Sequence, residues 1–197
     1  MTTANKVTIG RIILVPFFAV QLLYYFRTGE EVYRHIAIGA FLIATISDGI
    51  DGWLARHRNQ GTQLGTYLDP IADKLLLITG LVLLSIEFEN NPFGQRIPLW
   101  LTGTVLGRDI IVVTGSALVY LAVGDLKVRP HFLSKVSSVL QMLCIGWVLF
   151  KLSGKATFWL AVGASVTTAI TGLMYVMDGI RQFNEHPIAH PERDKEN

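Results

Sequence analysis

Four aspartates stand inside, or at the ends of, segments that are otherwise apolar enough to lie in a membrane. Asp48 and Asp51 come first, and Asp69 and Asp73 follow after a short polar stretch. A carboxylate in the hydrocarbon of a bilayer costs about 2.5–3.5 kcal/mol even on lenient insertion scales. These groups therefore need compensating partners, and clustered carboxylates favour hard divalent cations such as Mg²⁺ or Mn²⁺. The stretch predicts a metal site.

The residues around the aspartates suit the binding of a phosphate compound. Four carboxylates are more than one ion needs, so we predict two ions, which about 3.5–4 Å apart clamp a phosphate during an in-line displacement. Gly52, Ala55 and Gly65 leave room for a flat base or a diphosphate. Arg56, about one turn beyond Asp51, can pair with a phosphate oxygen.

The composition is that of an integral membrane protein. Of 197 residues, 51% are hydrophobic and 16% are charged, and the mean hydropathy is +0.43; about 25% charged residues is usual for a soluble domain. The single cysteine, Cys144, excludes a disulfide framework and a cysteine-rich zinc site. The first residues show no cleavage site, so we expect the first apolar run to be a retained helix.

Apolar stretches of about 20 residues, long enough to cross a bilayer, recur along the chain. We expect an all-α integral membrane protein with six transmembrane helices and a short interfacial segment near residues 3–8. Residues 1–183 would form one membrane domain, and residues 184–197 a polar, disordered tail. The expected spans are 9–26, 35–56, 67–87, 97–122, 132–152 and 156–180.

The distribution of lysine and arginine predicts a cytoplasmic N-terminus. Six spans place both termini on one side, and cytoplasmic loops carry an excess of positive residues. Lys74 and Arg108 fall within the spans. With the N-terminus inside, the inner side carries ten basic residues, Lys6, Arg11, Arg56, Arg58, Lys127, Arg129, Lys135, Arg181, Arg193 and Lys195, and the outer side carries five, Arg27, Arg34, Arg96, Lys151 and Lys155.

This topology brings the two pairs of aspartates together. The spacing of Asp48 and Asp51, and that of Asp69 and Asp73, places each pair on one face of a helix. The connection near residues 56–66 is short, which makes the second and third spans antiparallel neighbours. All four carboxylates are then expected to meet just below the cytoplasmic surface.

The pattern Asp-x2-Asp-Gly-x2-Ala-Arg-x8-Gly-x3-Asp-x3-Asp resembles the signature of the CDP-alcohol phosphatidyltransferase family. The opening Asn5-x2-Thr8-x2-Arg11 also resembles the start of the bacterial phosphatidylglycerophosphate synthases of that family. The resemblance covers about residues 3–183. All eight specified residues are present, at Asp48, Asp51, Gly52, Ala55, Arg56, Gly65, Asp69 and Asp73.

The resemblance implies a reaction and roles for individual residues. An alcohol would attack the lipid-side phosphorus of CDP-diacylglycerol, and CMP would leave. Asp48, Asp51 and Asp69 would hold two Mg²⁺ or Mn²⁺ ions, and Asp73 would be both a metal ligand and the base that deprotonates the acceptor hydroxyl. The residues implied in CDP-lipid binding are Thr8, Gly52, Ala55, Arg56, Thr62 and Gly65.

The later spans hold further polar residues with two interpretations each. Arg108-Asp109 either forms a local salt bridge or lines the acceptor site, where Arg129 is also expected. Lys135 either snorkels to the membrane surface or binds an acceptor phosphate or headgroup. Lys74 is expected to pair with a nearby acid rather than to take part in catalysis.

Other expectations concern partners and location. Gly103-x3-Gly107 permits a close helix contact, either within the chain or in a homodimer. We expect a multi-pass protein of the inner (cytoplasmic) membrane whose active site faces the cytoplasm and which binds membrane lipids but no nucleic acid.

The acceptor alcohol is either glycerol 3-phosphate, which we favour, or phosphatidylglycerol. Family members that use glycerol 3-phosphate tend to carry a second arginine late in the fourth span. In this chain Val119 occupies the position where that arginine is expected. The opening of the fifth span, from Arg129 to Ser138, is similar to CMP-forming cardiolipin synthases, which use phosphatidylglycerol.

Two other classes of function also place carboxylates in, or keep the fold of, such a membrane protein. A cation transporter also places carboxylates in a membrane, but it does not need Gly52, Arg56 and Gly65 at these spacings. A non-catalytic relative would lack one of the metal ligands, and all four are present.

Overall fold

The computed structural model describes residues 3–58, 63–88, 91–123 and 132–185, and the side chains of 8–47, 71–88, 91–121 and 132–181 among them. The ordered elements of these residues are helices, which confirms the expected all-α class. They are α1 (Thr3–Thr28), α2 (Glu31–Arg58), α3 (Gln63–Ser85), α4 (Leu99–Val123), α5 (Phe132–Leu149) and α6 (Gly154–Glu185).

Local sequence accounts for the breaks between helices. Gly29 ends α1 with a φ of 72°, a left-handed conformation that glycine adopts without strain, and its N–H donates to the carbonyl of Tyr25 at 2.9 Å. The Thr28 hydroxyl accepts from the N–H of Glu30, next to the start of α2. Pro98 stands directly before α4, at a helix start where its missing N–H is tolerated.

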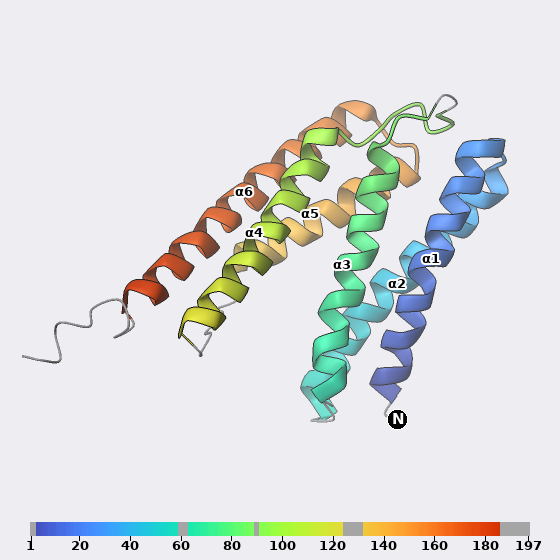
Figure 1. Ribbon diagram of the computed structural model, residues 1–197. Coiled ribbons are helices and arrows are strands. Elements are labelled where there is room, and N and C mark those ends of the chain that lie inside the picture. Colours follow the sequence, from blue (N-terminus) through green and yellow to red (C-terminus); the bar gives the residue numbers. More distant parts are fainter. Residues whose placement is uncertain (1–2, 59–62, 89–90, 124–131, 186–197) are drawn as a thin grey trace, which may run out of the picture.

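The helices alternate in direction and form two groups that α3 connects (Figure 1). α1 packs on α2 and α3, α6 packs on α4 and α5, and α3 also contacts α4 and α5. In this view α2, α4 and α6 run downward, and α1, α3 and α5 run back upward, α5 at the shallowest angle. The two ends of the described chain therefore lie on the same side of the molecule, as the sequence predicts.

The core is apolar and includes buried residues from all six helices. Phe18 and Leu22 of α1 and Ile145 of α5 are fully buried. Gly80 of α3 permits the closest approach in this core, because a Cβ there would lie 2.9 Å from Cδ1 of Ile145. A side chain at position 80 would require the Ile145 side chain to shift.

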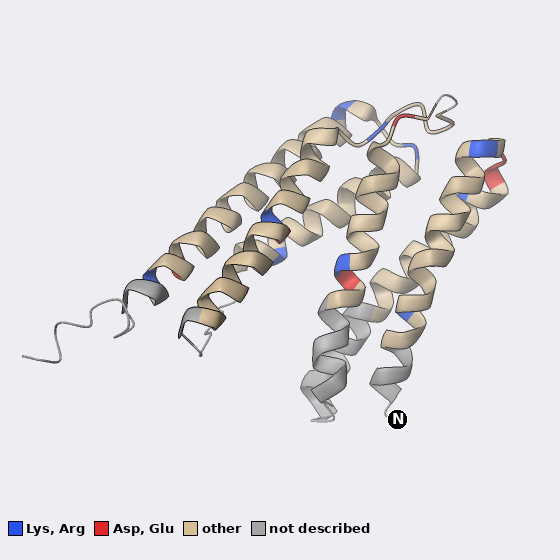
Figure 2. Cartoon of the chain, in the orientation of Figure 1, with Lys and Arg blue, Asp and Glu red and all other residues tan. Residues whose placement is uncertain are grey.

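Within the described residues, four helices are long and apolar enough to cross a membrane. They cover Thr8–Thr28, Leu99–Leu121, Phe132–Leu149 and Gly154–Arg181. Uncharged residues make up most of each of these helices, and charged residues are few (Figure 2). The described side chains of α2 and α3 cover only residues 31–47 and 71–85, which are too short for this criterion, so the prediction of six spans is supported for four helices.

Some expected boundaries differ from those of the structure. Residues 3–8 are the beginning of α1 and do not form a separate segment. α6 continues to Glu185, two residues beyond the expected end of the membrane domain at 183. The remainder of the expected tail lies outside the described residues.

Candidate active site

The aspartate motif lies where two antiparallel helices meet at one end of the molecule. Asp48 and Asp51 belong to the last turns of α2, Asp69 and Asp73 belong to α3, and the two helices are in contact (Figure 1). The backbone thus has the antiparallel arrangement that the sequence predicts. The following predicted site residues lie among 48–70, whose side chains are outside the described ones, so their roles stay predictions: Asp48, Asp51, Gly52, Ala55, Arg56, Thr62, Gly65 and Asp69.

Asp73, the predicted base, forms an ion pair with a buried arginine from another helix. Nη1 of Arg11 donates to Oδ1 of Asp73 at 2.7 Å, and this contact joins α1 to α3. The Arg11 side chain is 1% exposed, whereas that of Asp73 is 28% exposed. A buried guanidinium needs a carboxylate partner, and Asp73 provides one while remaining accessible. Thr8, one turn before Arg11, is also buried.

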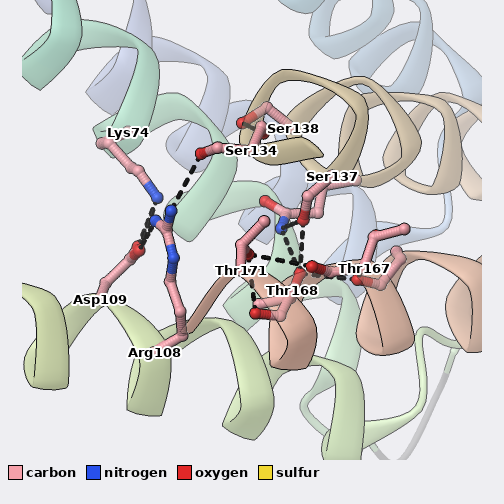
Figure 3. A network of polar contacts seen from close by, with 11 residues as sticks. Lys74, Arg108, Asp109, Ser134, Ser137, Ser138, Thr167, Thr168 and Thr171 are labelled. Carbon is pink, nitrogen blue, oxygen red and sulfur yellow. Dashed lines mark hydrogen bonds and ion pairs between the residues drawn. The ribbon is translucent and has the colours of Figure 1, made fainter. Parts of the chain in front are cut away.

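Lys74 and Asp109 join α3 to α4 directly beside the predicted base. Nζ of Lys74 lies 2.7 Å from both carboxylate oxygens of Asp109. Arg108 shares the same carboxylate, because its Nη1 lies 2.7 Å from Oδ1 of Asp109. Both cations converge on Asp109 in Figure 3. This confirms the predicted role of Lys74 as a partner of a nearby acid.

Arg108 also contacts α5 and α6. Its Nη2 donates to the hydroxyl of Ser134 at 2.9 Å (Figure 3), and its guanidinium carbon lies 5.1 Å from the ring centroid of Tyr175. The side chain is 12% exposed. Its Nε–H is buried and has no hydrogen-bond partner among the described residues. Arg108 therefore forms the predicted local salt bridge.

Next to Ser134, the interface of α5 and α6 contains a buried polar cluster (Figure 3). The hydroxyls of Ser137 and Thr168 lie 2.6 Å apart. The amide of Gln141 donates to both hydroxyls at 3.1 Å. These three side chains are at most 4% exposed, so the cluster fixes α5 against α6 in an otherwise apolar interface.

Two of the contacts around the motif were not predicted from the sequence. Arg11 was expected as a positive residue near the inner membrane surface and as part of the opening Asn5-x2-Thr8-x2-Arg11 pattern, and neither expectation included its contact with Asp73. The contact of Arg108 with Ser134 was not expected. For Arg11 a signal was present, since an arginine within an apolar run requires a carboxylate partner. The sequence does not show which carboxylate that is, because the partner belongs to a different helix.

The other predicted acceptor residues are placed only in part. Lys135 is exposed near the start of α5, one residue after Ser134. Arg129 lies outside the described residues. Val119, where a second arginine is expected in synthases that use glycerol 3-phosphate, is 8% exposed, and a Cβ added at Gly179 would lie 3.8 Å from it.

The donor set of the motif fits a divalent cation. Carboxylate oxygens are ligands that Mg²⁺ and Mn²⁺ prefer, and Asp73 is held in place by Arg11. No group of three possible metal ligands occurs among the residues whose side chains are described. Since the side chains of Asp48, Asp51 and Asp69 are outside that set, the metal site stays a prediction.

Comparison with known proteins identifies the family. The family model for CDP-alcohol phosphatidyltransferase matches residues 1–170. A CDP-diacylglycerol–glycerol-3-phosphate 3-phosphatidyltransferase of Bacillus subtilis (strain 168) is 34% identical over 154 residues, which are 74% of this chain and 75% of the relative. A probable phosphatidylglycerophosphate synthase of Mycobacterium tuberculosis (strain CDC 1551 / Oshkosh) is 33% identical over 184 residues, 91% of this chain and 82% of the relative. An Escherichia coli (strain K12) protein with the same name as the Bacillus relative is 30% identical over 147 residues, 73% of this chain and 74% of the relative. The chain belongs to the CDP-alcohol phosphatidyltransferase family.

Proposed function

We propose that this protein transfers a phosphatidyl group from CDP-diacylglycerol to glycerol 3-phosphate and releases CMP, a step of phospholipid biosynthesis. The observation that carries the proposal is the similarity to relatives named for this reaction, over about three quarters or more of the chain. The complete aspartate motif supports it. A transporter or a non-catalytic relative would not require both the similarity to these enzymes and the complete aspartate motif.

The proposed chemistry assigns two roles to the carboxylates. Asp48, Asp51, Asp69 and Asp73 would hold two Mg²⁺ or Mn²⁺ ions, which when bound supply positive charge to the diphosphate and so stabilise the departing CMP. Asp73 would also accept the proton of the acceptor hydroxyl. Arg11 supports this role because its contact with Oδ1 fixes the direction of the Asp73 carboxylate.

The acceptor would bind beside Asp73, toward α4 and α5. Arg108 is favoured as a phosphate ligand because it is a cation next to the predicted base: it shares Asp109 with Lys74, the residue after Asp73. Lys135 is exposed one residue beyond Ser134, the hydroxyl that Arg108 contacts. We assign Arg129 to the same site. A dianionic acceptor needs several such cations.

The setting of this reaction would be the cytoplasmic face of the inner membrane. Four apolar helices support a membrane location, and we propose that α2 and α3 also cross the membrane, with the metal ions compensating the aspartates. The excess of lysine and arginine on the side of the N-terminus supports a cytoplasmic active site.

We also propose that two copies of the chain form a homodimer through a contact between their α4 helices. A Cβ added at Gly103 or Gly107 would meet no atom within 4 Å. The pair therefore makes no close helix contact with the described residues, which favours the intermolecular interpretation of the Gly-x3-Gly pattern.

A CMP-forming cardiolipin synthase, with phosphatidylglycerol as acceptor, is the second candidate. It is favoured by Val119, an apolar residue where a second arginine is expected. Phosphatidylglycerol carries one negative charge on its headgroup, so this acceptor needs fewer cations.

Substitution of Lys135 tests the proposed acceptor. If glycerol 3-phosphate binds there, Lys135→Ala or Arg129→Ala should raise its KM more than about tenfold, because a charge-assisted contact contributes roughly 1.5–3 kcal/mol. The KM for CDP-diacylglycerol should change little. Lys155→Ala, an exposed lysine at the opposite end of the molecule, is the control. An unchanged glycerol 3-phosphate KM in both variants would remove these residues from the site.

A further inference from the structure

The α6 residue Gly172 makes space for Arg108. A Cβ added at Gly172 would lie 3.2 Å from Cγ of Arg108 and 3.7 Å from its Cβ. The first distance is shorter than ordinary van der Waals contact between carbons. Gly172 is itself buried. The stem of Arg108 therefore lies directly against the backbone of α6.

Tyr175 follows Gly172 by three residues and so lies on the same face of α6. Its ring is 5.1 Å from the guanidinium carbon of Arg108, within the range of a cation–π interaction. The other contacts of Arg108 come from Asp109 on α4 and Ser134 on α5. Three helices thus hold the head of this arginine, and Gly172 decides how close its stem comes to α6.

We propose that Gly172 and Tyr175 are positioning residues for Arg108, which they hold in the direction needed to bind the phosphate of the acceptor. The inference rests on the proposed function, in which Arg108 is an acceptor ligand. It adds that part of the acceptor specificity lies on α6, in residues that do not contact the acceptor themselves.

The test is Gly172→Ala, with Gly163→Ala on the same helix as its control. A Cβ at Gly163 would lie 3.8 Å from Cδ1 of Leu140, an ordinary contact. Both changes raise helix propensity equally, so they differ mainly in the effect on Arg108. We expect Gly172→Ala to raise the KM for glycerol 3-phosphate about tenfold, the lower end of what loss of a charge-assisted contact costs. The KM of Gly172→Ala for CDP-diacylglycerol should stay near that of the wild type. Both KM values of Gly163→Ala should also stay near those of the wild type.

Two further measurements separate positioning from a general loss of structure. Glycerol 3-phosphate should raise the melting temperature of the wild type and of Gly163→Ala in detergent, and raise that of Gly172→Ala less. In an Arg108→Met background, Gly172→Ala should add nothing to the KM, because residues that act through one group are not additive. Tyr175→Leu should raise the acceptor KM about threefold through loss of the cation–π contact.

The outcomes distinguish this inference from the proposed function. A wild type that neither binds nor uses glycerol 3-phosphate contradicts the proposed function. A wild type that uses it, together with a Gly172→Ala variant of unchanged KM and unchanged melting response, contradicts only the role of Gly172. An additive effect of Gly172→Ala in the Arg108→Met background would also overturn that role.

Discussion

At the scale of single residues, the Asp73 carboxylate must be accessible to a substrate and must also pair with a buried arginine. It is 28% exposed and so accessible to a substrate, while Arg11 holds its Oδ1 at 2.7 Å. The Arg11 guanidinium therefore fixes the orientation of the carboxylate that would accept the proton. The contact explains why an arginine is buried in the first helix, a placement that would be unfavourable without a carboxylate.

Replacement of the base should abolish turnover and leave substrate binding intact. Asp73→Asn keeps the shape of the side chain and leaves three of the four aspartates of the motif. We expect the rate to fall by at least about 10²-fold, the lower range for removal of a positioned general base. Binding of CDP-diacylglycerol, measured directly, should persist. Asp48→Ala should instead weaken metal and nucleotide binding together with the rate. Near-normal turnover by Asp73→Asn would show that another group takes the proton.

The sequence predicts the chemistry of individual residues better than their partners. The pairing of Lys74 with an acid was predicted, because a lysine beside the motif needs a counterion. The pairing of Arg11 with Asp73 was not, because spacing along one helix indicates which residues share a face and does not indicate which helix lies opposite. The same limit applies to Arg108, whose contacts Ser134 and Tyr175 come from two other helices.

At the scale of elements, a charged contact joins two helix connections at the end of the molecule opposite the motif. Nζ of Lys151, just after α5, lies 2.7 Å from Oε1 of Glu31 at the start of α2. The same lysine lies 5.5 Å from the ring centroid of Tyr25. Lys151 has a φ of 54°, and the N–H of Leu152 donates to the carbonyl of Trp147, which is the pattern of a Schellman motif.

This contact predicts a pH-dependent stability. The hydrogen bond from Lys151 lowers the pKa of Glu31 below its ordinary value of 4.5. A lowered carboxyl pKa stabilises the fold above pH 4.5, and this contribution is lost as the pH falls through the folded-state value. The melting temperature of the wild type should therefore exceed that of Glu31→Gln at pH 7, and the difference should disappear in acid.

Glu87→Gln provides the matched control for this measurement. Glu87 pairs with Arg96 at the same end of the molecule, but the two side chains are 80% and 52% exposed, so its loss should have little effect. If Glu31→Gln had the same melting temperature as the wild type at pH 7, the contact with Lys151 would not contribute to stability.

Helices were predicted well, and their ends and pairings less well. All six predicted segments are helical, because each is a long apolar run. The fifth was expected to reach residue 152 but ends at Leu149, since the left-handed cap is formed by a lysine and not by the glycine that marks most such ends. The approach of α3 to α5 at Gly80 depends on the shape of Ile145, which hydropathy does not reveal.

At the scale of the whole molecule, the described contacts near the motif connect helices of both groups. Arg11 joins α1 to α3, Lys74 joins α3 to α4, and Arg108 extends the contacts from α4 to α5 and α6. The acceptor site that we propose thus depends on helices from the entire chain. This long-range dependence explains why the motif alone does not identify the acceptor.

Metal removal should abolish the reaction. If the aspartates of the motif hold divalent ions, an excess of chelator should stop CMP release, and added Mg²⁺ or Mn²⁺ should restore it. Melting in detergent should not collapse in chelator, because the apolar core formed by the described residues lies outside the motif. Full activity in excess chelator would remove the ions from the proposed chemistry.

The central claim is the transfer of a phosphatidyl group to glycerol 3-phosphate, and the identity of the product tests it most directly. Purified protein is supplied with CDP-diacylglycerol, Mg²⁺ and radiolabelled glycerol 3-phosphate, and in parallel with phosphatidylglycerol. We predict that CMP is released in proportion to label entering the lipid fraction as phosphatidylglycerophosphate. If the label stays in the aqueous phase while phosphatidylglycerol is converted to cardiolipin with CMP release, the choice of acceptor is wrong and Val119 indicated the correct one.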